Sequence, residues 1–152
     1  MSTEFTPQYW QLNVLADNFM ESSFSIVGFP CDQFAHQEPG ANKTELLAGL
    51  RYVRPGMNYT PHFTLHMKIH VNGEDEQPLY RYLKDSCPVP LDASYDRSES
   101  FWDPIKVNDI SWNFEKFLID HNGRPLFRFR PDVEPMDLRE LVELMLDRSL
   151  DP

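Results

Sequence analysis

The segment that most constrains how this chain folds is a loop, residues 28–40, that follows a short apolar run. The run, residues 24–27, reads Phe-Ser-Ile-Val, which is typical of a buried strand. Glycine or proline punctuates both ends of the loop, at Gly28, Pro30, Pro39 and Gly40. In α/β proteins a loop after a buried strand commonly carries polar groups that contact a ligand. The amide of Gln33 can donate and accept hydrogen bonds, so it is a candidate site residue. A surface turn with a buried Cys31 is the alternative.

The composition favours one globular domain that covers residues 1–152. The hydrophobic and charged fractions, 41% and 25%, are those of a soluble protein. No apolar run approaches the length of a membrane span, and no secretory signal is recognised at the N-terminus. The formal net charge of −10 argues against a nucleic-acid partner. The two cysteines do not make a disulfide framework, and no cysteine or histidine spacing predicts a metal site.

Two helices are predicted in the first third of the chain. Thr6 as N-cap and Pro7 at the first helical position start one of them. Asn42 and Glu45 form a capping-box pattern at the start of the other, which covers residues 42–53. The expected apolar stripes are Tyr9, Leu12, Leu15, Ala16 and Phe19 in the first helix, and Leu46, Leu47 and Leu50 in the second.

Two more helices are predicted further along the chain. Residues 78–84 form a short helix, and the last helix begins near Pro135. The inward positions are expected to be Leu79, Tyr82 and Leu83 in the short helix, and Leu138, Leu141, Val142 and Met145 in the last one. Between them, residues 85–108 form a long proline-punctuated segment, which in a compact domain is commonly functional. Its aromatic pair, Phe101 and Trp102, either anchors an interface or packs the segment onto the body of the protein.

Strands alternate with these helices. Residues 63–71 alternate between apolar and polar, which predicts a half-buried strand that ends at the Asn72-Gly73 turn. Strands at 114–119 and 126–129 are joined by a turn at 121–124. The polar face of the first strand carries His62, His66 and His70, and we expect it to be solvated. Four residues of a strand span about 13 Å, which is too far for two of these histidines to share one metal ion. The predicted class is α/β.

Residues 29–35 and, about eighty residues downstream, residues 112–118 form two stretches whose separation and order closely resemble the signatures of the glutathione peroxidase family. Its Phe-Pro-Cys-Asn-Gln-Phe-Gly loop is matched by residues 29–35, with Asp32 and Ala35 as substitutions. Its Trp-Asn-Phe-x-Lys-Phe-Leu strand is matched without change by residues 112–118. The resemblance extends through residues 52–56 and 71–73, and it covers nearly the whole chain from about Thr6 onward.

The resemblance implies a thioredoxin-like fold, here lacking the N-terminal strands, and an activity. Members of the family reduce hydrogen peroxide and organic hydroperoxides with glutathione, in defence against oxidative stress. A selenolate or thiolate attacks the peroxide and becomes a selenenic or sulfenic acid. Gln33, Trp112 and Asn113 match three of the four catalytic residues, and their neutral N–H groups are suited to holding an anion. The structural alternatives are a core tryptophan and an asparagine that caps a strand edge.

The fourth catalytic residue has no match in this sequence. The family's selenocysteine or cysteine would fall at Ser2 or Thr3, and a hydroxyl has too high a pKa to replace it. We therefore expect the chain as written to be inactive. One hypothesis is that a selenocysteine UGA codon was read as a stop, so that the sequence restarts at Met1. The alternative is a catalytically inactive paralogue with a binding or structural role.

The resemblance also implies substrates, assembly and location. No cofactor is expected, and glutathione is the expected reductant, because helix 42–53 has no resolving cysteine of the thioredoxin-dependent kind. Arg54 and Arg128 match arginines that bind the glutathione carboxylates, a role that suits bidentate guanidinium groups. The alternative for each is a surface salt bridge, and Phe127 replaces a further family arginine. The 85–108 segment resembles the plasma-type branch, which implies a homotetramer and an extracellular location. A cytoplasmic location is the alternative.

Overall fold

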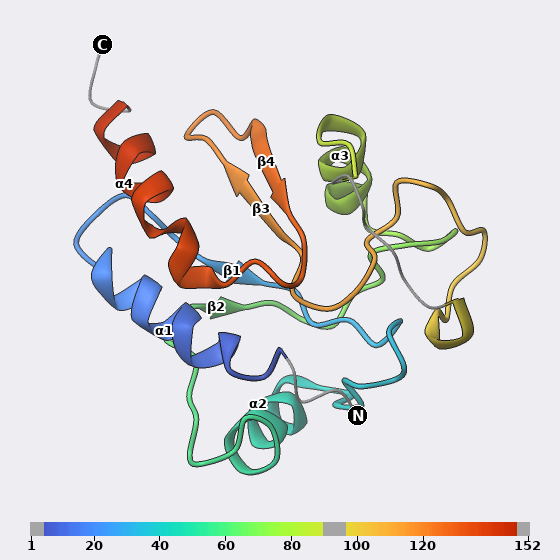
Figure 1. The fold of residues 1–152 in the computed structure, drawn as a ribbon. Coiled ribbons are helices and arrows are strands. Elements are labelled where there is room, and N and C mark those ends of the chain that lie inside the picture. Colours follow the sequence, from blue (N-terminus) through green and yellow to red (C-terminus); the bar gives the residue numbers. More distant parts are fainter. Residues whose placement is uncertain (1–4, 90–96, 149–152) are drawn as a thin grey trace. The chain divides into compact units, whose positions relative to one another are not determined.

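The computed structural model describes residues 5–89 and 97–148, whose helices and strands are drawn in Figure 1. The chain divides into two compact units. Unit 1 comprises Met1–Pro30, Gly40–Met67 and Val133–Pro152. Unit 2 comprises Cys31–Pro39 and Lys68–Asp132. The chain therefore passes between the units several times. The expectation of a single domain over residues 1–152 stays a prediction.

Unit 1 contains a short parallel strand pair and most of the helical residues. Strand β1 (Val27–Gly28) pairs with β2 (Thr64–Leu65), with Val27 opposite Thr64 and Gly28 opposite Leu65. Both strands are much shorter than the predicted runs at 24–27 and 63–71. A strand can extend only as far as a partner offers backbone groups, and here the ladder is two residues long. The three histidines beside the predicted strand are exposed, as expected: His62, His66 and His70.

The first helix, α1 (Gln8–Asn18), begins one residue later than predicted. Pro7 occupies the N-cap position and Thr6 makes no side-chain cap, so the predicted cap is wrong. The reason is that Pro7 already has helical angles, while the Thr6 carbonyl accepts a backbone hydrogen bond from Tyr9 at 3.2 Å. Leu15 is buried within the helix and Phe19 at its C-cap.

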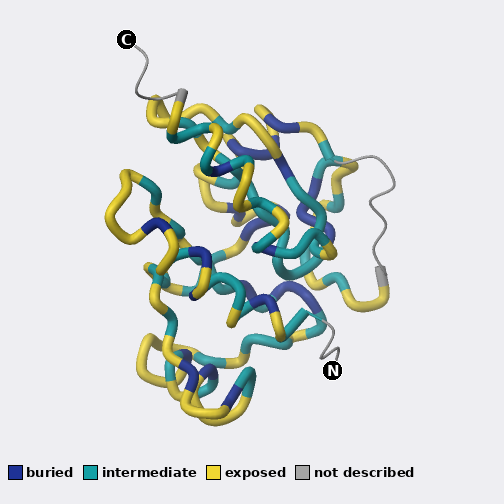
Figure 2. Tube along the Cα trace, turned by 60° about the vertical axis from the view of Figure 1, so that its left-hand side comes forward, coloured by how far each residue is buried: buried dark blue, intermediate teal, exposed yellow. Residues whose placement is uncertain are grey.

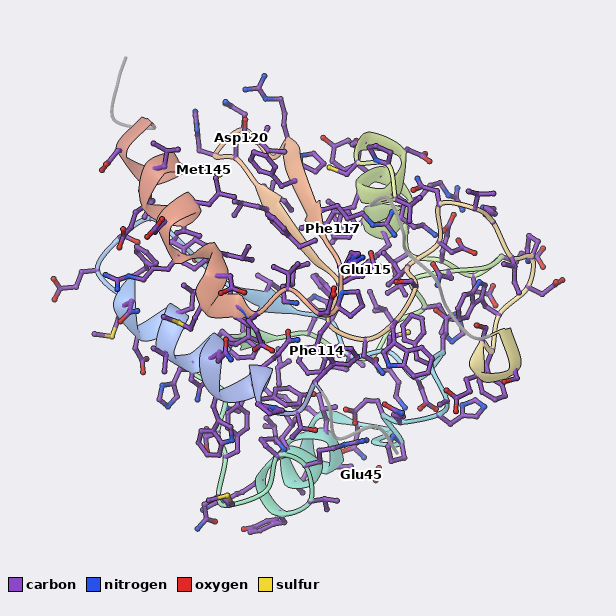
Figure 3. All side chains as sticks on the ribbon, in the orientation of Figure 1. Glu45, Phe114, Glu115, Phe117, Asp120 and Met145 are labelled. Atoms are coloured by element: carbon purple, nitrogen blue, oxygen red, sulfur yellow. The ribbon has the colours of Figure 1, made fainter. Side chains whose placement is uncertain are left out.

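Helix α2 (Lys43–Tyr52) begins with the predicted capping box. The Asn42 Oδ1 atom accepts a hydrogen bond from the Glu45 backbone N–H at 3.0 Å. The carboxylate of Glu45, labelled in Figure 3, accepts a hydrogen bond from the Ala41 N–H at 2.9 Å. Leu46 and Leu50 are buried, so the predicted stripe faces the core of unit 1.

Asn13 is the polar centre of unit 1. Its Nδ2 donates to the Thr60 carbonyl at 2.8 Å, and its Oδ1 accepts from the Tyr59 hydroxyl at 3.0 Å and the His62 N–H at 2.8 Å. The last helical segment begins at Pro135, as predicted, as the 3₁₀ turn η2 (Pro135–Leu138) that leads into α4 (Arg139–Arg148). Figure 2 shows where the buried residues lie. In the described part of unit 1, the buried apolar side chains include Leu15, Phe19, Leu46, Leu50, Tyr59 and Val142.

Unit 2 contains the antiparallel hairpin that the sequence predicts. Strand β3 (Lys116–Ile119) pairs with β4 (Pro125–Phe129), with Phe117 opposite Arg128. Gly123 has a φ of +79°, which glycine adopts readily, and the Asp120 N–H donates to the Arg124 carbonyl at 2.9 Å. The strand starts at 116 rather than 114, because Phe114 lies in a turn with a φ of +67°.

Helix α3 (Pro78–Ser86) faces the core differently from the prediction. Leu83 is buried, but Leu79 and Tyr82 are exposed by 41% and 47%. The buried face instead includes Lys84, whose ammonium group lies 2.5 Å from Glu76 and 3.1 Å from Asp109. These carboxylates compensate the buried charge, so the helix turns a lysine rather than a second leucine inward.

The segment before the hairpin contributes the short 3₁₀ turn η1 (Arg97–Glu99). The aromatic pair that follows is divided. The Trp102 indole N–H donates to Asp109 at 2.8 Å and its ring lies 5.4 Å from that of Phe34, so Trp102 packs onto unit 2. Phe101 is half-exposed and its ring lies 4.0 Å from that of His36, so an interface role for Phe101 stays a prediction.

Candidate active site

The Gln33 side chain is buried and its amide has one fixed orientation. The Oε1 atom accepts from the backbone N–H groups of Val71 at 2.8 Å and Asn72 at 3.1 Å. The Nε2 atom donates to the Asn72 carbonyl at 2.9 Å. Rotating the amide by 180° would place an NH₂ group against two N–H donors, so the orientation cannot be reversed without losing all three bonds. The nitrogen, with its second hydrogen, is therefore held at a defined position.

The backbone of the Gln33 loop is held by the segment 99–101 and by a hydrogen bond within the loop. The Gln33 carbonyl accepts from the Phe101 N–H at 3.0 Å, and the Ala35 N–H donates to the Glu99 carbonyl at 2.9 Å. Asp32 accepts from the Glu38 N–H at 3.0 Å. Ala35, which replaces the glycine of the resembled motif, has a φ of +51°. A left-handed conformation costs a non-glycine residue roughly 1–2 kcal/mol, so the surrounding bonds must hold it.

Trp112 and Asn113 lie in a turn before β3 rather than on a strand, which corrects the prediction for this motif. The half-buried Trp112 ring lies 5.8 Å from the ring of Phe34, next to Gln33 in sequence. The Asn113 amide donates to the Gln37 side-chain oxygen at 3.3 Å. Both residues thus contact the loop that carries Gln33. All three predicted donors belong to unit 2, and Trp112 and Asn113 reach the Gln33 loop through Phe34 and Gln37.

A buried ion pair closes the turn that carries Trp112 and Asn113. Glu115, which directly precedes β3 (Figure 3), accepts from the Ser111 N–H at 2.5 Å and from the Ser111 hydroxyl at 2.6 Å. Its other carboxylate oxygen lies 2.7 Å from the Arg128 Nε atom. The side chains of Arg128 and Glu115 are only 1% and 2% exposed. Phe114, whose φ is +67°, therefore lies between Ser111 and Glu115, and the bonds of these two residues hold its strained backbone in place.

Arg128 forms an ion pair, which the sequence analysis gave as the alternative to glutathione binding. The pair is buried inside the protein, however, and not at its surface. Besides Glu115, its guanidinium group donates to the Asn108 side-chain oxygen at 2.9 Å and to the Asp109 carbonyl at 2.9 Å. A glutathione carboxylate would have to displace these partners. Arg54 belongs to unit 1, where it follows α2 and is half-buried. The glutathione-binding role of both arginines stays a prediction.

Neither cysteine has the properties of a peroxidatic nucleophile. Burial raises the pKa of the Cys31 thiol, which donates weakly to the Gln33 Oε1 atom at 3.4 Å. Burial also raises the pKa of Cys87, although the charge of Arg128 opposes the shift. A thiol attacks peroxide as its thiolate, so a raised pKa disfavours both. Cys31 is buried, as its structural interpretation requires. The predicted nucleophile positions, Ser2 and Thr3, lie outside the described residues.

The sequence analysis missed a buried polar cluster beside the site. Asn72 and Lys84 lie at its centre, with the carboxylates of Glu76 and Asp109 around the ammonium group. Asn72 was interpreted only as part of a turn, and the turn itself is present, with Gly73 at a φ of +85°. No local signal in the sequence indicated this cluster, because Lys84 lies away from the predicted apolar side of its helix and its partners lie on other segments of unit 2.

Among residues 5–89 and 97–148, no group of three histidine, cysteine, aspartate or glutamate side chains is placed to hold a metal ion. Within the same ranges, no helix has the length and apolar character needed to cross a membrane.

The fold and the site define an α/β protein in which a turn with Trp112 and Asn113 packs against the loop that carries Gln33. Comparison with known proteins agrees with this class. The family profile described as glutathione peroxidase matches residues 2–84. An epididymal secretory glutathione peroxidase of Rattus norvegicus is 52% identical over 124 residues, which are 82% of this chain and 56% of that protein. A cuticular glutathione peroxidase of Brugia malayi is 46% identical over 130 residues, 84% of this chain and 58% of that protein.

A solved structure supports the fold. The crystal structure of T. cruzi GPX1 matches with a TM-score of 0.62 and 26% identity, and covers 92% of this chain and 71% of that one. This chain belongs to the glutathione peroxidase family, and the thioredoxin-like fold expected from the resemblance is confirmed. The chain spans somewhat more than half the length of the curated relatives that it matches.

Proposed function

We propose that this protein is a glutathione peroxidase in which Gln33, Trp112 and Asn113 stabilise the anionic form of the peroxidatic residue. The observation that carries the proposal is the fixed Gln33 amide, whose oxygen is held by the N–H groups of Val71 and Asn72. The nitrogen is the end of the amide that can serve an anion. The turn with Trp112 and Asn113 adds further donors from the neighbouring segment.

The proposed donors suit this chemistry because they are neutral. An amide or indole N–H stabilises a selenolate or thiolate without a titrating group of its own, so the effect does not depend on pH. In the first step the anion attacks a peroxide oxygen, the O–O bond breaks, and a proton completes the alcohol or water that leaves. One glutathione then converts the selenenic or sulfenic acid into a mixed adduct and releases water. A second glutathione displaces oxidised glutathione and restores the anion.

The test is peroxide-dependent oxidation of glutathione by the protein at the full length that its gene encodes. Trp112→Phe removes one donor and keeps an aromatic ring, and loss of one such donor commonly costs about 10²–10³ in rate. The matched control is Trp10→Phe, which changes a partly exposed tryptophan of unit 1 and should leave the rate unchanged. A full-length protein without turnover would exclude the proposed function. Equal rates for the two variants would exclude the role of Trp112.

The 152-residue chain itself contains only two cysteines, Cys31 and Cys87. Because both thiols are buried, we expect no turnover from this chain alone. Sequencing the transcript upstream of the Met1 codon tests the selenocysteine hypothesis. The inactive-paralogue alternative gains no support from the relatives, which carry peroxidase names.

We further propose that the reductant is glutathione rather than a thioredoxin. Helix α2 contains no cysteine that could resolve the oxidised enzyme through a disulfide. An extracellular location is proposed because the Rattus norvegicus relative is named as secretory. A homotetramer is proposed from the 85–108 segment, part of which lies outside the described residues. Size-exclusion chromatography with light scattering measures this assembly directly.

A further inference from the structure

Asn72 makes two reciprocal amide pairs, one on each side of the candidate site. Its backbone pairs with the Gln33 side chain, with the Asn72 N–H donating at 3.1 Å and its carbonyl accepting at 2.9 Å. Its side chain pairs with the Ile110 backbone, with Nδ2 donating to the carbonyl at 2.9 Å and Oδ1 accepting from the N–H at 2.9 Å. Asn72 is only 1% exposed. One residue therefore joins the Gln33 amide to the segment that ends in Trp112.

We propose that Asn72 is a positioning residue that sets the separation of the Gln33 amide and the Trp112 indole. The inference rests on the proposed function, because it concerns how the peroxidase donors are held. Ile110 lies two residues before Trp112, so a shift of its backbone moves the indole directly. An asparagine suits the role because one rigid amide supplies both a donor and an acceptor to the same backbone residue.

The other contacts between these segments are less directional. The Phe34 and Trp112 rings, 5.8 Å apart, pack without fixing a register. The Asn113 to Gln37 bond is long, at 3.3 Å, and joins two half-buried side chains. The Asn72 pairs are shorter, buried and reciprocal. They are the contacts that hold two planar groups at a defined distance.

Lys84 fixes the orientation of the Asn72 side chain. Its ammonium group donates to the Asn72 Oδ1 atom at 3.2 Å, beside the bond from Ile110. A flipped amide would turn its NH₂ group toward this cation, which is strongly unfavourable. The Lys84 charge is in turn balanced by Glu76 at 2.5 Å and Asp109 at 3.1 Å. The buried ion cluster thus bonds to the Asn72 amide through Lys84, and its other member Asp109 directly precedes Ile110 in the chain.

The test compares Asn72→Ala with Asn13→Ala. Each asparagine side chain makes three hydrogen bonds, and Asn13 makes them in unit 1. The readouts are the NMR signals of the Gln33 side-chain NH₂ and of the Trp112 and Trp10 indoles, together with peroxidase activity of the full-length protein. We expect Asn72→Ala to shift the Gln33 and Trp112 signals and leave Trp10 in place. Misplacement of catalytic groups by about 1 Å can cost on the order of 10² in rate, so kcat/KM for the hydroperoxide should fall by about that factor.

A pH profile separates positioning from loss of stability. If the donors no longer converge on the anion, its pKa rises, and the acid limb of the pH–rate profile moves to higher pH. Asn13→Ala should lower the unfolding midpoint without moving this limb. Should Asn72→Ala fail to fold, Asn72→Asp keeps the shape and the oxygen that accepts from Ile110 and Lys84, but turns a second oxygen and a negative charge toward the Ile110 carbonyl. Because this charge could itself shift the acid limb, the readout for Asn72→Asp is the NMR signals of Gln33 and Trp112.

The NMR result decides the inference even if the full-length protein does not reduce peroxide. Unchanged Gln33 and Trp112 signals in a folded Asn72 variant would overturn it, because the two donors would then be held by other contacts. Shifted signals without any peroxidase activity in the unsubstituted protein would leave the positioning role standing and exclude the proposed function. Full activity of Asn72→Ala with an unmoved acid limb would also overturn the inference.

Discussion

Unit 1 and unit 2 bury polar side chains of different kinds. In the described part of unit 1, the buried polar residues are Gln8 and Asn13, both neutral. In the described part of unit 2 they include four charged residues and three neutral ones: Glu76, Lys84, Asp109, Arg128, Gln33, Asn72 and Ser111. In the described part of unit 1, the Arg139–Glu143 ion pair and the hydrogen bond between His62 and Asp17 are both exposed.

The difference concerns the hydrogen bonds and ion pairs that each unit buries. Burial of charges is expensive, and apolar side chains of similar volume often give equal or greater stability. Stability alone therefore does not explain the clusters in unit 2. The Lys84 cluster bonds to Asn72, and the Arg128–Glu115 pair bonds to Ser111 in the Trp112 turn, so each reaches a segment of the candidate site. In unit 2, buried charged groups thus bond directly to the site segments, whereas the buried polar contacts of unit 1 centre on the neutral Asn13.

The largest expected effect comes from Arg128→Leu in unit 2. It leaves the Glu115 carboxylate buried without its cation, and breaking a buried pair costs about 3–5 kcal/mol. The matched control in unit 1 is Arg139→Leu, which removes an exposed pair worth less than about 1 kcal/mol. Urea unfolding measures both. Equal costs would show that the buried and exposed pairs are equivalent and would remove the contrast between the units.

The next effect is expected for Leu50→Ala in unit 1. Leu50 is 3% exposed, and truncating a buried leucine to alanine costs about 2–5 kcal/mol. Hydrogen exchange resolved by residue locates the loss. We expect protection to fall first in α1 and α2, with a smaller change in β3 and β4. Uniform loss in both hairpin and helices would mean that the two units unfold as one.

The sequence was sufficient for features encoded by neighbouring residues. The capping box at Asn42 and the hairpin turn at Gly123 depend on residues a few positions apart, and both are present. The grouping of Gln33 with Trp112 was predicted through family motifs rather than from the residues themselves. Features that depend on distant partners were missed. Periodicity could not place Lys84 inside, because its partners lie on other segments of unit 2.

The free energy of unfolding should depend on pH more in unit 2 than in unit 1. The expected change is smaller than that of Leu50→Ala and larger than that of Asn42→Ala. Burial alone would raise the pKa of Glu76, but hydrogen bonds from Lys84 and Arg81 outweigh it and hold the pKa below its ordinary value. A depressed carboxyl pKa contributes stability above the unfolded-state value, and that stability is lost as pH falls through the folded-state value. Stability should therefore decline below about pH 4.3, the ordinary glutamate value.

Glu76→Gln isolates this contribution. One titrating group changes the unfolding free energy by at most about 1.4 kcal/mol per pH unit. The variant should be less stable than the wild type at pH 7, and the gap should narrow as pH is lowered from 5 to 3. Urea midpoints across this range provide the measurement. A gap that stays constant would mean that the Glu76 carboxyl titrates alike in both states. The control is Glu143→Gln, whose exposed pair in unit 1 should give a much smaller change.

The smallest expected effect is Asn42→Ala, which removes the exposed N-cap of α2. Loss of an asparagine cap costs about 1 kcal/mol. The cost is small because the exposed Glu45 N–H, which donates to Asn42, can donate to water instead. The contrast with Asn72, another asparagine that accepts a backbone N–H, sharpens the comparison between surface and interior. Asn42→Asp keeps the acceptor and should restore most of the stability, measured as the urea midpoint. If Asn42→Ala were as costly as Arg128→Leu, exposure would not be what separates the polar contacts of unit 1 from those of unit 2.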